Sequence, residues 1–333
     1  MNRIQEKCEE LAKNYEIMRK GNQLEHTSLV AAGAAMFVAA GKEADAERLL
    51  ACRKLIKQRK GIFSNFRGYA EFVIRCKMAL AEDPEAYLNR LDEIYAGLKN
   101  FFSTSQTVLA AVMIADLTEP VLQMEAVKRT KEIYKEMEKA HFFMTSQDDM
   151  PFAALMAAMG RDSASVYEEA EKIYAILKTD LRATGETRQM LSHILSIYPG
   201  PAEARCAKLC SIAEGLKEAG HALSRNRYMA VIGTLAASQA PTEQIVSMIG
   251  EADGCLKQYR PFKGIFGVGR NFRRMVAVQM AAAVLEEQGA SPVLGAAGVS
   301  SMISSSIEVA IITLVTMYAI IASASASSAS NNS

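Results

Sequence analysis

The chain has 333 residues, half of them hydrophobic, and a formal net charge of +1 at pH 7. A nearly neutral chain has no overall field that attracts nucleic acid or an anionic membrane, so we expect neither as a partner. Six cysteines without a secretory leader indicate reduced thiols and a cytoplasmic location. Cys206 and Cys210 share a helix face, but no further ligand accompanies them, so we expect no metal and no other cofactor.

One helical phrase recurs along the chain with steps of 38, 42, 39, 40, 39 and 40 residues. We call the position of Leu98 in each copy the marker position, and its occupants are Met18, Ile56, Leu98, Met137, Leu177, Leu216 and Leu256. A period of this length is typical of arrays whose units cannot bury their apolar faces alone. We therefore predict an all-α fold of seven αα-hairpins, with an eighth near the C-terminus.

Each unit is predicted to contain two helices of different character. In the first helix, Leu91, Ile94 and Leu98 lie at helical spacing with charged residues between them, which indicates one wet face. The second helix, as in residues 108–115 and 152–159, is apolar on nearly all sides and must be buried. First helices thus form an outer layer and second helices an inner one, as in a two-layer α-solenoid or an αα-toroid.

The turn before the second inner helix contains the sequence K-G-I-F-x-x-x-R from Lys60 to Arg67, and the same sequence returns from Lys263 to Arg270. Free backbone N–H groups and the helix dipole favour an anion at such a helix start. Lys60, Arg67, Lys263 and Arg270 are therefore candidates for binding a phosphate or carboxylate. The more common role of such a turn is structural, with Gly permitting the backbone and Phe filling the core.

Two acidic residues and one histidine are candidates for catalysis. Asp148 and Asp149 precede the fourth inner helix and could serve acid–base or metal chemistry, although Asp at this position is also the expected helix cap. His193 lies within an apolar inner helix, where a hydrogen-bonded core histidine is more common than a catalytic one. Whether the protein is an enzyme stays open at this point.

The segment from Met302 to Ala322 holds a single charge, Glu308, in 21 residues and is long enough for a membrane span. However, its apolar run begins where the period places an eighth inner helix, and no Lys or Arg follows Arg274 to anchor a span. We predict a buried final helix within a single domain of residues 1–322, followed by a disordered tail of residues 323–333.

Several phrases of the chain resemble those of a known family. They are the run Gly61 to Gly68, the run Phe143 to Asp149, the segment Leu191 to Leu195 and the Ser-Ala tail. Together they resemble the uncharacterised bacterial family called domain of unknown function 4003, over nearly the whole chain. The resemblance implies a cytoplasmic bacterial protein and carries no activity with it.

Arrays of helix pairs mostly bind other chains along a groove, so we expect a binding or scaffold module for a protein, a peptide or a small anionic ligand. The alternative is an enzyme on an αα-toroid, in which polar groups at the starts of the inner helices would surround a central pocket. Contact between the first and the seventh hairpin would place those groups around one pocket.

Overall fold

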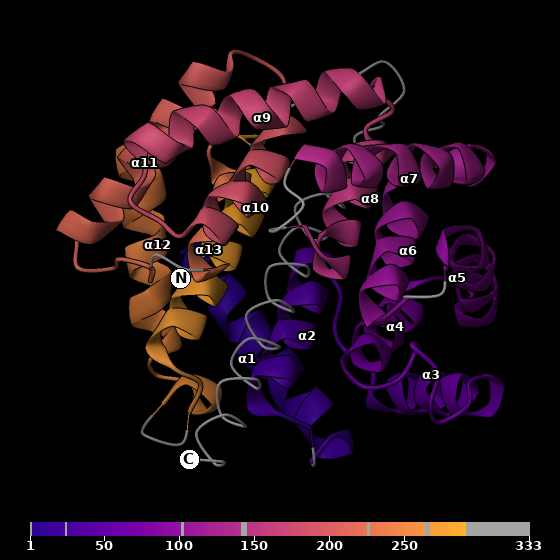
Figure 1. Cartoon of the computed structure of the whole chain (residues 1–333). Coiled ribbons are helices and arrows are strands. Elements are labelled where there is room, and N and C mark those ends of the chain that lie inside the picture. Colours follow the sequence, from indigo (N-terminus) through magenta and orange to yellow (C-terminus); the bar gives the residue numbers. More distant parts are fainter. Residues whose placement is uncertain are drawn as a thin grey trace, which may run out of the picture.

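The computed structural model describes residues 2–23, 25–100, 103–140, 145–224, 227–263 and 267–290. Within these ranges the chain forms helices joined by short loops, and no strand occurs (Figure 1). The prediction of an all-α protein is confirmed.

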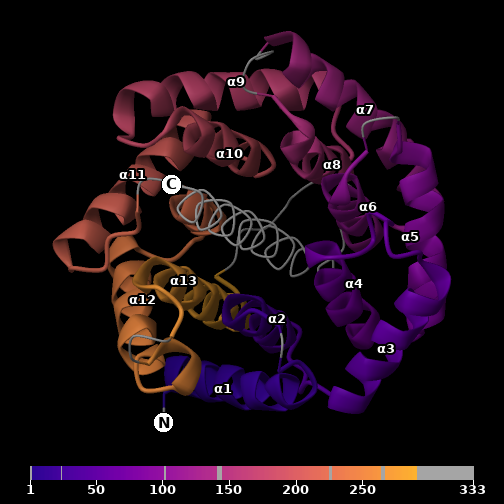
Figure 2. The same ribbon diagram turned by 60° about the horizontal axis from the view of Figure 1, so that its bottom comes forward.

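The helices alternate along the chain between two layers, and we keep the terms outer and inner for them (Figure 2). The outer helices are α1 (Arg3–Gly21), α3 (Ala46–Arg59), α5 (Pro84–Leu98), α7 (Gln123–Ala140), α9 (Ser163–Asp180), α11 (Ala202–Glu218) and α12 (Thr242–Leu256). The inner elements are α2 (Thr27–Ala39), α4 (Tyr69–Leu80), α6 (Ser105–Leu117), α8 (Met150–Ala158), α10 (Gly185–Ser196), the 3-10 helix η3 (Arg227–Leu235) and α13 (Arg270–Glu287). Three shorter 3-10 turns precede α7, α8 and α13: η1 (Pro120–Leu122), η2 (Gln147–Asp149) and η4 (Arg260–Phe262).

Each outer helix buries one face, and the marker positions lie on it. All seven marker side chains are at most 2% exposed. Charged residues of the same helices, such as Glu85 and Glu93 of α5, are exposed to solvent. The wet and dry faces therefore follow from the helical spacing of apolar residues.

The inner helices are buried on all sides, as their composition requires. In α8 every residue from Met150 to Ala158 is buried. Small residues allow the helices to approach closely, most clearly at Gly33 of α2. A Cβ atom at this position would lie 2.6 Å from Met18 Cε of α1 and 2.7 Å from a ring carbon of Phe72 of α4.

The contacts within each layer form a closed series. In the inner layer α2, α4, α6, α8, α10, η3 and α13 each contact the next, and α13 contacts α2. In the outer layer the series runs from α1 through α3, α5, α7, α9, α11 and α12, and α12 contacts α1. Figure 2 shows the helices around a common centre, with the first and last of them side by side. We call this arrangement the ring.

The starts of neighbouring inner helices lie together at one edge of the ring, which we call the N-terminal edge. Asn65, before α4, donates from Nδ2 to the carbonyl of Ser103, before α6, at 2.8 Å. Thr107 in α6 reaches Gln147, at the start of η2, with 3.5 Å between the two side-chain oxygens. Polar contacts thus join the turns that precede α4, α6 and α8.

The ends of the inner helices lie at the opposite edge, where basic side chains satisfy their last carbonyl groups. Arg48 donates from Nε to the carbonyl of Ala79 at 2.8 Å, and Arg161 donates to the carbonyl of Ser196 at 2.7 Å. Cations at this end of a helix also complement its dipole. These bonds attach α4 to α3 and α10 to the turn before α9.

Two predictions concern residues 302–322 and 323–333, which lie outside the described residues. In the part of the chain that the structure describes, none of the helices combines the length and the apolar character that crossing a membrane requires.

Candidate functional site

The first of the two predicted basic turns is occupied by internal partners. Lys60 forms an ion pair with Asp92, and its ammonium group lies 4.2 Å from the centroid of the Phe66 ring. Arg67 Nε lies 2.6 Å from a carboxylate oxygen of Glu71. Both cations therefore have a counter-charge within the protein. The Phe of the repeated sequence, Phe63, was expected to fill the core, but it is 95% exposed, and Phe66, 2% exposed, fills the core instead.

The second basic turn lies elsewhere in the ring. Lys263 and Arg270 are both exposed, and between them lie residues 264–266, which are outside the described ranges. In the inner contact series α2 stands between α4 and α13, so the two turns are not adjacent. The structure therefore does not join the four predicted basic residues into one site.

The two aspartates lie at the start of α8, in a capping arrangement. The backbone N–H of Ser146 donates to Asp149 Oδ2 at 2.9 Å, and the N–H of Asp148 donates to Ser146 Oγ at 3.2 Å. His193 is 1% exposed inside α10, and its ring centroid lies 5.7 Å from that of Phe152 in α8. These contacts give Asp148, Asp149 and His193 structural roles at the start of α8 and within α10.

One position of the recurring phrase determines whether a side chain fills the gap between an outer helix and the preceding turn at the N-terminal edge. The residue three places before the marker is tyrosine in four copies, at positions 15, 95, 134 and 174. Tyr95 shows what this side chain does. Its hydroxyl accepts a hydrogen bond from Asn65 Nδ2 at 2.9 Å, and its ring meets that of Phe66 edge-on at 5.1 Å between centroids. The tyrosine thus fills the gap between an outer helix and the preceding turn.

The other three copies carry Arg53, Ala213 and Asp253 at this position. Ala213 of α11 lacks the ring that fills the corresponding gap at Tyr95, and a pocket of about 350 Å³ lies there. The pocket is bounded by α11, the turn between α9 and α10, and η3. We call it the Ala213 pocket, and its lining residues are Asp180, Leu181, Arg182, Cys210, Ala213, Glu214, Leu216, Lys217, Ala222, Leu223, Met229 and Ile232.

The lining of the Ala213 pocket combines apolar side chains with charges of both signs. Leu181, Leu216 and Ile232 are buried and supply an apolar floor. The charged lining residues are two acids, Asp180 and Glu214, and two bases, Arg182 and Lys217, so their charges cancel. Lys217 and Glu214 form an ion pair at the surface, with both side chains 57% exposed.

The thiol of Cys210 also lines the Ala213 pocket. Burial raises the pKa of this thiol above its ordinary value, and the charge of Asp180 raises it further. A thiol with a raised pKa stays protonated near pH 7 and is a weak nucleophile. Cys210 therefore contributes an apolar wall to the pocket.

Asp253 of α12 replaces the tyrosine in the seventh copy and is fully buried. Its Oδ1 lies 2.7 Å from Arg273 Nε of α13, and its Oδ2 lies 3.0 Å from Nδ1 of His221, in the preceding turn. Burial by itself raises the pKa of the Asp253 carboxyl, but Arg273, His221 and Lys257 together outweigh it and lower the pKa. The carboxylate joins three segments in place of the tyrosine ring.

Arg53 of α3 makes the same connections with the charges reversed. Its guanidinium lies 3.5 Å from Glu25, in the preceding turn, and 3.3 Å from Glu71 of α4. Glu25 also lies 3.5 Å from Arg75, and Glu71 is the partner of Arg67. Arg67 is thus part of a compensated ion network.

Neither Ala213 nor Asp253 was among the residues predicted from the sequence to form a site. The signal that identifies them is the departure from tyrosine at a position where four other copies keep it. Recognising it requires knowing that this position faces the preceding turn, which the structure supplies.

The described residues define an all-α protein with a small pocket at one edge of its paired helices. The family model for proteins of unknown function called DUF4003 matches residues 14–319, and the chain belongs to this family, as its phrases predict. The uncharacterized protein YeaA of Bacillus subtilis (strain 168) is 22% identical over 208 residues, a match that covers 59% of this chain and 62% of YeaA. The chain thus spans less than two thirds of that relative. No solved structure matches the chain.

Proposed function

We propose that the protein is a binding scaffold built as an αα-toroid of seven hairpin repeats, with its ligand site in the Ala213 pocket. The toroid is supported by the contacts of α12 with α1 and of α13 with α2. The repeat is supported by the burial of all seven marker residues at nearly constant steps.

The composition of the Ala213 pocket carries the proposal of a peptide segment as the ligand. An apolar floor accepts an apolar side chain, while acids and bases at the rim can bind both the N–H and the C=O groups of a peptide backbone. A small anion would require an excess of positive charge, whereas the two bases here are balanced by two acids.

Catalysis in a central pocket is the alternative and has less support. Among its candidate groups, Arg67 is paired with Glu71, and Asp149 accepts a hydrogen bond as part of a helix cap. Each of these groups would have to give up an internal partner to act on a substrate.

The sharpest test is the substitution Ala213→Tyr, because it introduces the residue that four other copies carry at this position. We expect the variant to fold, and its melting temperature to equal or exceed that of the parent, since the ring fills an existing space. Peptides selected from a displayed random library on the parent protein should bind the variant roughly tenfold or more weakly, as measured by fluorescence anisotropy.

The matched control is Ala96→Tyr, at an exposed position of the outer face of α5. It adds the same ring away from the pocket and should leave peptide affinity unchanged. Selected peptides that bind the parent and Ala213→Tyr equally well would contradict the proposal, as would a library from which no peptide is enriched.

A further inference from the structure

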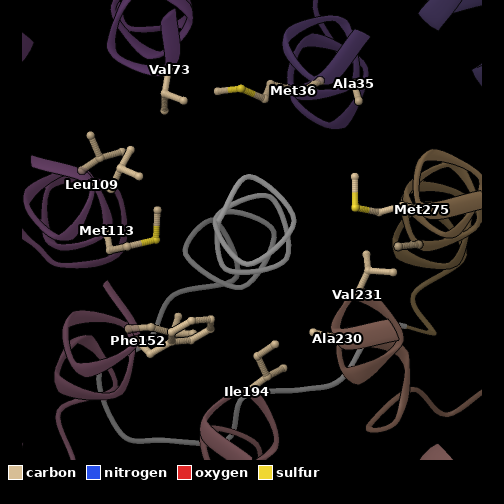
Figure 3. Close-up of a cluster of buried hydrophobic side chains, with 14 of the residues drawn as sticks. Ala35, Met36, Val73, Leu109, Met113, Phe152, Ile194, Ala230, Val231 and Met275 are labelled. Atoms are coloured by element: carbon tan, nitrogen blue, oxygen red, sulfur yellow. The ribbon is translucent and has the colours of Figure 1, made fainter. Parts of the chain in front are cut away.

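Large apolar side chains are mostly buried in this protein. Figure 3 shows this for Met113, Phe152 and Met275 of the inner helices, which are 0% exposed. Ile62 and Phe63 are exceptions, because these neighbours in the turn before α4 are 75% and 95% exposed. Two adjacent apolar side chains left in water at a turn indicate a surface that another molecule covers.

The chain around Ile62 and Phe63 is basic. Residues 53–67 include six Lys or Arg and neither Asp nor Glu. The four of these bases that have acidic partners are Arg53, Arg59, Lys60 and Arg67. Each of their acids is shared by two bases, so the acids are outnumbered. Lys54 and Lys57, one turn apart on α3, are exposed and pair with no acid among the described residues. A local excess of positive charge therefore lies beside the two apolar side chains.

A second basic turn opens onto the same edge of the ring, on the other side of α2. Glu287, at the end of α13, lies 2.7 Å from Lys7, near the start of α1, so α13 begins at the edge where α1 ends. This is the N-terminal edge, where α2 and α4 also begin. Lys263 and Arg270, in the turn before α13, are exposed there. A flat surface can contact both basic turns at once, whereas a small ligand cannot, because the turns are not adjacent.

We propose that the N-terminal edge of the ring docks on an anionic lipid bilayer, with Ile62 and Phe63 inserted between the headgroups. A bilayer satisfies both features of the turn, since its hydrocarbon accepts apolar side chains and its anionic headgroups attract Lys and Arg. The net charge of +1 for the whole chain does not oppose this docking. Salt limits the reach of exposed charges to about 8–10 Å, so only the local excess acts on the bilayer.

A fluorescent reporter at the turn tests the proposal directly. The chain contains no tryptophan, so Phe63→Trp introduces a single one at a fully accessible position. Vesicles of equal amounts of phosphatidylglycerol and phosphatidylcholine should shift its emission to shorter wavelength, and brominated lipid chains should quench it. Vesicles of phosphatidylcholine alone should produce neither change, and high salt should weaken the response to the anionic vesicles.

The matched control for the reporter is Val121→Trp. Val121 is 85% exposed, but it lies in η1 at the opposite edge of the ring, and the acids Glu119 and Glu125 are close to it in the chain. Neither kind of vesicle should change the emission of this variant. No response of Phe63→Trp to anionic vesicles would overturn the proposal. An equal response to neutral vesicles would also overturn it, because an apolar anchor elsewhere in the chain would then account for the binding.

The contribution of charge is tested in the Phe63→Trp background. Replacing both Lys54 and Lys57 by Gln should weaken binding to the anionic vesicles roughly tenfold or more, because each cation near the bilayer is attracted to it. Lys128 and Lys131 of α7 are exposed at the same spacing, and their replacement by Gln should leave binding unchanged. Equal effects of the two double substitutions would refute the role of the basic turn.

Co-sedimentation of the parent chain with the same vesicles shows whether binding occurs without the reporter. Phe63→Ser should bind the anionic vesicles roughly tenfold more weakly than the parent, since it removes an apolar side chain that the bilayer would bury. A parent chain that stays in the supernatant would contradict the proposal. Binding to polyglutamate or to single-stranded DNA in place of the vesicles would assign the edge to an acidic macromolecule instead.

Discussion

At the scale of single residues, Asp253 depends most strongly on the groups around it. It is fully buried, and it is stable as a carboxylate because Arg273 and His221 replace the water that it lost. The same position holds a tyrosine in four other outer helices, which fills space without any charge. The charge therefore makes the junction of α11, α12 and α13 sensitive to the protonation of one group.

We expect Asp253→Asn to lower the free energy of unfolding by roughly 3 kcal/mol at pH 7, because it leaves the Arg273 guanidinium without its counter-charge. Urea denaturation measures this change. The control is Glu43→Gln, whose exposed ion pair with Lys13 should be worth less than about 1 kcal/mol.

The loss in Asp253→Asn should also depend on pH. Because the folded state lowers the pKa of Asp253 below its ordinary value of 3.8, the unfolded state takes up the proton first as the pH falls. The stabilisation by the carboxylate is complete above about pH 4 and is lost as the pH falls through the folded pKa. The difference between parent and variant should therefore shrink below about pH 4, and a constant difference would refute this role of Asp253.

At the scale of elements, the inner helices differ from ordinary amphipathic helices in how closely they approach their neighbours. Gly33 marks the tightest approach, because α1 and α4 both press against the same turn of α2. A side chain there competes with the end of Met18 and the ring of Phe72. Gly254 of α12 provides the contrast, since no atom lies within 4 Å of a Cβ at that position.

Replacing each of these glycines by alanine should therefore have opposite effects. In a helix the substitution is intrinsically favourable by about 0.5–1 kcal/mol, and Gly254→Ala should show this gain in chemical denaturation. At Gly33 the overpacking cost of about 1–3 kcal/mol should prevail, so that Gly33→Ala is destabilised. A gain at both positions would mean that α2 can move away from its neighbours at little cost.

At the scale of the whole molecule, the closed contact series gives every hairpin two neighbours. In an open array the first and last units each lack one interface, and the ends can unfold separately. Here α1 contacts α12 and α13, and Lys7 of α1 lies 2.7 Å from Glu287 of α13. Opening any one unit breaks two interfaces.

Hydrogen exchange under native conditions should therefore show a single large cooperative unit. The slowest amides of α2 and of α8, in different hairpins of the ring, should exchange with the same opening free energy and the same dependence on denaturant. Clearly different values for the two helices would show that the ring opens in parts.

The sequence alone was sufficient to predict an all-α protein and the amphipathic or apolar character of its helices. The reason is that these properties are local. Apolar residues at helical spacing are buried whichever neighbouring element packs against them, as Leu98 and Met137 show. The family could also be predicted, because its phrases are continuous in the chain.

Only the tertiary structure decided which side chains contact the turns and helices of neighbouring hairpins. Arg67 suggested an anion site in the sequence, yet Glu71 neutralises it, and the effect of Ala213 depends on a turn about 30 residues earlier. Contact of α13 with α2 likewise depends on the angles between successive hairpins, which add up around the ring and are set by the sizes of the side chains that meet there. A repeat period states how often a unit returns, whereas closure depends on how far each unit is rotated from the one before.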